Sequence, residues 1–113
     1  MKNTDNRMTA AIIKMERLEK RMAEIEVILQ DPASEKDIQA LLLEVGNMLS
    51  EAECILAKAK ADELTLLLKS KPTASANEQK VLVDAKCADL HRTARMIEHV
   101  NRALGIILAT KRN

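Results

Sequence analysis

The sequence predicts an all-α protein in which three long helices form an elongated antiparallel bundle resembling a coiled coil. The 113 residues include no Phe, Tyr or Trp, two Gly and two Pro. Without aromatic side chains, a core has to combine many small contacts along long surfaces, which helix packing provides. So few turn residues argue against a sheet protein. The length suits one domain, and we expect residues 1–113 to form it.

The first predicted helix, residues 4–30, carries a heptad pattern. Its a positions are Met8, Met15, Met22 and Leu29, and its d positions are Ala11, Leu18 and Ile25. An a/d seam packs a helix lengthwise against another helix, in the same chain or in a partner. We therefore predict a partner or oligomer interface at Met8, Met15, Leu18, Met22, Ile25 and Leu29.

Charges beside this seam indicate a direction of pairing. Lys14 and Arg21 fall at g, and Glu19 and Glu26 fall at e. In a parallel pair of copies, g lies beside e of the other chain, whereas an antiparallel pair would bring like charges together. The pattern favours a parallel homodimer if this helix pairs with itself. Short connections favour antiparallel packing within the chain instead, and the sequence leaves both arrangements open.

Two prolines divide the chain into its three helices. Asp31-Pro32 and Lys71-Pro72 each interrupt a helical pattern, because proline lacks a backbone donor and restricts the preceding residue. The second helix is predicted over residues 34–70, capped by Ser34 or started at Asp31-Pro32. The third is predicted over residues 76–111, where Ser75 precedes Glu78 in a capping box.

The second helix is predicted to continue through Gly46. One helical stripe crosses the glycine without a change of phase; it comprises Ile38, Leu41, Leu42, Val45, Met48, Leu49, Ala52, Ile55, Leu56 and Ala59. The alternatives are a new helix capped at Ser50, or a helix-turn-helix with Gly46 in its turn. The second fits poorly, because Leu42 and Asn47 stand where such motifs carry a small and an apolar residue.

A further apolar set lies on the opposite side of the second helix. It comprises Leu43, Cys54, Ala57, Ala61, Leu64 and Leu68. A helix that is apolar on two faces has to be covered twice. Either this helix lies between the other two, or its second face docks a partner or a second copy, with Leu43, Leu64 and Leu68 as the contacts.

The third helix presents a basic face. His91, Arg92, Arg95, His99 and Arg102 lie opposite its apolar positions, and residues 76–113 hold seven Lys or Arg against four Asp or Glu. Such a face could contact phosphates of a nucleic acid or an acidic protein. Acidic neighbours dilute it, and the chain has no aromatic residue for base stacking.

The sequence predicts no catalytic, cofactor or metal site. Cys87 and His91 have the spacing of a helical metal pair, and in a helical hairpin Cys54 would lie at about the same level, yet a fourth ligand is missing. No acid, oxyanion hole or glycine-rich loop accompanies these residues. The cysteines are expected to be reduced thiols in a cytoplasmic protein, since no apolar run approaches roughly 18 residues and the polar N-terminus is unlike a signal peptide.

These features favour a non-enzymatic helical interaction protein, such as an adaptor, small chaperone or assembly factor. It would act through apolar helix faces on another protein or on itself, as a homodimer or larger homo-oligomer. The alternative is a small nucleic-acid-binding accessory protein that uses the basic face of the third helix.

Overall fold

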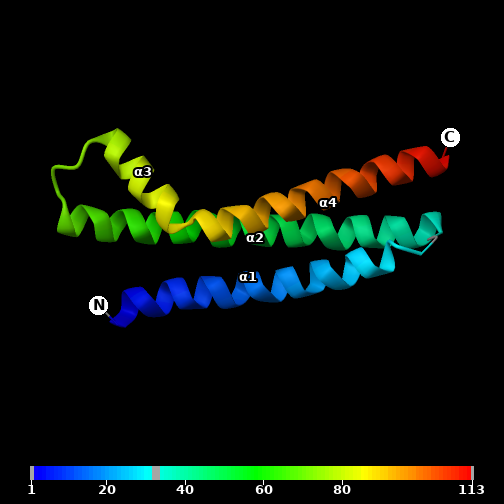
Figure 1. Cartoon of the computed structure of the whole chain (residues 1–113), viewed down its shortest axis with the longest axis horizontal. Coiled ribbons are helices and arrows are strands. Elements are labelled where there is room, and N and C mark those ends of the chain that lie inside the picture. The colour runs from blue at the N-terminus through cyan, green and yellow to red at the C-terminus, as the bar shows by residue number, and fades with distance from the viewer. Residues whose placement is uncertain (1, 32–33, 113) are drawn as a thin grey trace.

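The structure, a computed structural model, is all-α over the residues that it describes, 2–31 and 34–112. Its helices are α1 (Lys2–Ile28), α2 (Glu35–Ser70), α3 (Ala76–Lys86) and α4 (Ala88–Arg112). In Figure 1, α2 lies between α1 and α4 and runs antiparallel to both. The molecule measures 56 × 27 × 17 Å. The predicted fold class is therefore confirmed at the level of an elongated helical protein.

The number of helices corrects the sequence prediction. Residues 76–111 were expected to form one helix, but the helix is interrupted at Cys87, whose backbone lies at φ −102° and ψ 12°. Backbone hydrogen bonds continue on both sides, from Cys87 N–H to Val83 O at 3.1 Å and from His91 N–H to Cys87 O at 2.9 Å. The break therefore redirects the chain and lets α3 lean away from the line of α4 (Figure 1).

The second helix follows its prediction closely. It runs without interruption through Gly46, which has no positive φ, and ends at Ser70 as expected. The Ser34 hydroxyl accepts a hydrogen bond from Asp37 N–H at 3.1 Å, so Ser34 is the N-cap. The alternative start at Asp31-Pro32 includes Pro32, which lies outside the described residues. Ser75 caps α3 in the same way through Glu78 N–H at 3.1 Å.

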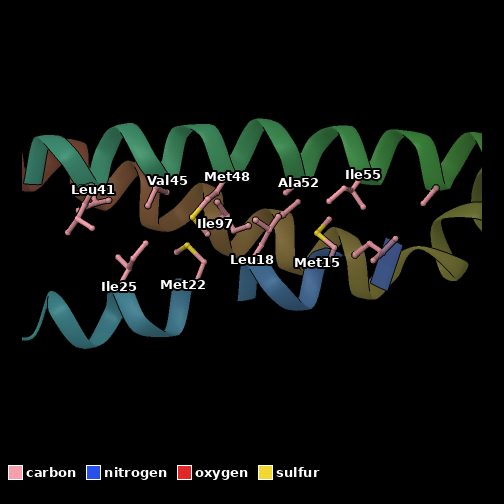
Figure 2. Close-up of a cluster of buried hydrophobic side chains, with 14 of the residues drawn as sticks. Met15, Leu18, Met22, Ile25, Leu41, Val45, Met48, Ala52, Ile55 and Ile97 are labelled. Carbon is pink, nitrogen blue, oxygen red and sulfur yellow. The ribbon is translucent and has the colours of Figure 1, made fainter. Parts of the chain in front are cut away.

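One hydrophobic core joins all four helices. Figure 2 shows side chains of α1 and α2 pointing toward one another, with Ile97 of α4 between them. The buried residues of α2 are Ile38, Leu41, Val45, Met48, Ala52, Ile55 and Ala59, which all belong to the predicted main stripe. Met and Leu from α1 fill the space opposite them. The aromatic-free core is thus built lengthwise, as the composition requires.

An ion pair joins the surfaces of α1 and α2. The Glu44 carboxylate accepts hydrogen bonds from Arg21 Nε at 2.5 Å and from Arg21 Nη2 at 2.9 Å. The hydrogen bonds from this guanidinium hold the pKa of Glu44 below its usual range, although partial burial acts in the opposite direction. Both side chains are more than one third exposed, so solvent screens the pair.

We expect Glu44→Gln to lower the melting temperature slightly at pH 7. A carboxyl group with a depressed folded-state pKa stabilises the fold above its unfolded pKa of about 4.3. That contribution is lost as the pH falls through the folded-state pKa, so the difference between wild type and variant should narrow from pH 7 toward pH 2. Thermal unfolding followed by circular dichroism measures the melting temperatures of the wild type and the variant at each pH. Glu26→Gln, on the exposed side of α1, is the control; equal melting temperatures for both variants at pH 7 would contradict the role of the pair.

Candidate partner-binding surfaces

The heptad seam of α1 is packed inside the molecule. Met15, Leu18, Met22 and Ile25 are buried in the core, and Met8, Ala11 and Leu29 pack against its edge. The seam therefore has its partner helices in the same chain, namely α2 and α4. These residues would contact a second copy only if α1 left its own bundle and exchanged with that copy.

The charges beside the seam also have partners within the chain. Arg21 binds Glu44 of α2 and Glu24 of α1, while Glu19 accepts a hydrogen bond from Thr93 Oγ1 of α4. Lys14 lines the cavity between α1 and α2 described below. The predicted pairings of Lys14 with Glu19 and of Arg21 with Glu26 in a parallel dimer stay predictions.

The second face of α2 is covered only at its C-terminal end. Leu64 packs against the core and, together with Ala61, faces α3, while Leu68 is 39% exposed. Cys54, Ala57 and Ala61 are exposed, and Leu43 is 70% exposed. We name the open part, Leu43, Cys54 and Ala57, the outer face of α2. The helices α1 and α4 cover the main stripe and leave this face to solvent.

The basic face of the predicted third helix lies on α4 and points outward. Its five members, His91, Arg92, Arg95, His99 and Arg102, are all exposed. Arg92 pairs with Asp89 at 3.3 Å, and Arg102 pairs with Glu98 at 3.3 Å. Part of the positive charge is thus balanced locally, and contact with nucleic acid stays a hypothesis that ranks below a protein partner.

The two cysteines have opposite environments. Cys87 is fully buried at the junction of α3 and α4, whereas Cys54 and His91 are exposed. Burial, followed by the negative charge of Glu63, raises the pKa of the Cys87 thiol. Within residues 2–31 and 34–112, no three His, Cys, Asp or Glu side chains come together in an arrangement that would hold a metal ion.

An open groove between α1 and the start of α4 was not predicted. Its volume is about 480 Å³. Ile12 and Met15 of α1 and Leu90 and Met96 of α4 line it with apolar side chains; Ile12 is 41% exposed and Met96 is 38% exposed. We call it the α1–α4 groove. The only sequence signal was that Ile12 and Met96 are apolar residues outside the predicted stripes, which does not reveal that they line one groove.

Carboxylates stand along the rim of the α1–α4 groove. Glu16 and Glu19 project from α1 and Asp89 from α4, with Arg92 beside them. Thr93, which is 4% exposed, donates its hydroxyl hydrogen bond to Glu19 and so links the two walls. The groove therefore combines an apolar floor with a rim that carries more negative than positive charge.

A second cavity, of about 430 Å³, lies between α1 and α2. Met8, Ala11, Ile55 and Leu66 provide its apolar lining, and Cys54 is at its side. Its charged residues have both signs, with Arg7, Lys14, Arg17 and Lys58 against Glu51, Asp62 and Glu63. Arg7 and Asp62 pair across it at 3.6 Å. This balance of charge favours no particular ligand.

Comparison of the chain with protein-family models, with curated proteins and with solved structures finds no match. No helix in the described part of the chain has the length and apolar character needed to cross a membrane. The functional argument therefore depends on the surfaces themselves.

Proposed function

We propose that this chain is a non-enzymatic helical interaction module, acting as an adaptor, small chaperone or assembly factor. The observation that carries the proposal is the α1–α4 groove, where Ile12 and Met96 remain exposed beside the buried Met15 and Leu90. Such a strip of apolar surface between two helices is the kind of surface that a partner helix covers. The described helices meet in short connections, which leave few loops from which a catalytic pocket is usually built.

We propose further that the chain forms a homo-oligomer through the outer face of α2. Leu43, at 70%, is the most exposed large apolar side chain in the described part of the chain. Ala57, about four turns further along the same face of α2, would let a second helix approach closely there. Self-association of this kind satisfies the second apolar face of α2 without displacing α1 from its own bundle.

Sedimentation velocity at micromolar concentration tests the self-association. Interference detection is required, because the chain contains no Trp or Tyr. We expect the wild type to sediment as a dimer or larger oligomer and Leu43→Lys to sediment as a monomer at the same concentration, because a buried, unpaired lysine opposes the interface.

The matched control is Val81→Lys on α3, where the side chain is 57% exposed and lies outside the outer face of α2. It should sediment like the wild type. A monomeric wild type would refute self-association. An oligomer that Leu43→Lys leaves intact would refute this face as the interface and would direct attention to exchange of α1.

A further inference from the structure

We propose that the α1–α4 groove binds an amphipathic helix in which large apolar side chains are flanked by Lys or Arg. This inference rests on the proposed function and adds the chemistry of the partner to it. It depends on three properties of the groove: its parallel helical walls, its apolar floor and the charge of its rim.

The walls of the groove favour a helix as the occupant. Helices α1 and α4 run in the same direction on two sides of α2 (Figure 1). Side chains from residues 12–19 of α1 and 89–96 of α4 line the groove between them. A fourth helix in this opening would complete a four-helix arrangement, which is a common way for helices to bury apolar faces. Successive large side chains on one face of such a helix, at i, i+3 or i+4 and i+7, would lie along the apolar lining formed by Ile12, Met15, Leu90 and Met96.

The rim of the groove favours a basic partner. Asp89 is already compensated by Arg92 at 3.3 Å. Glu19 accepts a hydrogen bond from the neutral Thr93 hydroxyl, which leaves its negative charge uncompensated by that contact. Glu16 is exposed beside it and forms no ion pair in the described part of the chain. Two carboxylates thus border apolar surface, where a covering helix would reduce solvent screening and strengthen attraction to Lys or Arg.

A second copy of this chain is the competing occupant. Arg95, Arg102 and Ile106 are exposed on α4, so this helix also presents positive charge beside an apolar side chain. Ile106 is a single large apolar residue on that side, however, whereas the groove offers apolar contacts from both walls. We therefore favour a separate helix with several apolar residues and let the experiment distinguish the two.

Titration with synthetic helices provides the test. Three peptides of about 18 residues, rich in helix-forming residues, share the same Leu positions and one central Trp, and differ in having Lys, Gln or Glu at the flanking positions. Because the protein has no Trp, the peptide fluorescence is free of background. We expect the Trp emission of the Lys peptide to shift to shorter wavelength on binding. We also expect the Lys peptide to bind at least about tenfold more tightly than the Glu peptide. Added salt should reduce this preference.

Two variants of the full chain locate the binding surface. Ile12→Lys places a cation in the floor, and Glu16→Lys reverses one rim charge. Each should weaken binding of the Lys peptide by about tenfold or more. Their controls are Val27→Lys, on α1, where the side chain is 62% exposed and lies outside the groove, and Glu53→Lys on α2. Circular dichroism checks that all four variants remain folded; each replaced side chain is exposed.

The outcomes separate this inference from the proposed function. If the Lys, Gln and Glu peptides bind equally well and Ile12→Lys abolishes their binding, the inference of a basic partner is wrong. The proposed function as an interaction module would then still stand. Absence of binding by every peptide would overturn the inference, and together with a monomeric wild type it would overturn the proposed function as well. An oligomer that Ile12→Lys dissociates and Val27→Lys does not would identify a second copy as the occupant and so overturn the inference.

Discussion

Replacement of Ile97 by alanine is expected to lower the free energy of unfolding by about 2–5 kcal/mol. Ile97 is fully buried on α4 and lies between side chains of α1 and α2 (Figure 2). Its truncation removes apolar contacts with both helices and leaves a cavity at the centre of the core. The chain has no aromatic side chain with which to refill the space. Domains of this size have a total stability of about 5–15 kcal/mol, so the loss is a large fraction of it.

The matched control is Ile106→Ala on the same helix. Ile106 is 68% exposed, and its truncation should change the free energy of unfolding by no more than about 0.5 kcal/mol. Urea unfolding followed by circular dichroism at one fixed protein concentration compares the two, since self-association would make stability depend on concentration. Similar losses for both variants would contradict the core described here.

The helical stripes were predictable because burial in a helix repeats with the helical period. The α2 stripe from Ile38 to Ala59 and the α1 seam from Met15 to Ile25 are buried as one face of each helix. Gly46 did not interrupt α2, since the apolar residues on both sides keep one phase and the glycine keeps helical geometry. Ser34 and Ser75 were readable as caps because their hydroxyls satisfy backbone donors that the first turn leaves free.

The break at Cys87 was not predictable in the same way. Residues 83–91 contain neither Gly nor Pro, the residues that usually mark a change of helix direction. The change accompanies tertiary packing, because Val83 and Cys87 are buried and Lys60 of α2 pairs with Asp84 of α3 at 3.6 Å. A local sequence pattern does not encode the position of α2, and so it did not reveal the break.

The α1–α4 groove shows the same limit for the candidate site. Ile12 and Met96 lie outside the predicted stripes, and whether such positions on two helices come to line one groove depends on how α1 and α4 are rotated around α2. The heptad pattern of α1 predicts an interface, and within the chain Met15, Leu18, Met22 and Ile25 of this pattern form the core face of α1. The groove adds to the core residues Met15 and Leu90 the weaker positions Ile12 and Met96, which stay exposed after the core has formed.

Cys54 is expected to react with iodoacetamide at least about a hundred times faster than Cys87 at pH 8. Cys54 is exposed, whereas Cys87 is fully buried. The thiolate is the reactive form, and burial raises the pKa of Cys87, which lowers its thiolate fraction. Reaction at Cys87 further requires the junction of α3 and α4 to open; an opening cost of about 3 kcal/mol alone slows the reaction about a hundredfold.

Single-cysteine variants, Cys54→Ser and Cys87→Ser, allow each rate to be followed by the gain in mass of the intact chain. In urea both thiols should react at similar rates, because unfolding removes the difference in burial. Comparable rates under native conditions would contradict a closed junction and would mean that α3 detaches from α2 at little cost. A slow Cys87 would instead indicate that the α3–α4 junction is held closed by packing, in addition to the two backbone hydrogen bonds that Cys87 makes with Val83 and His91.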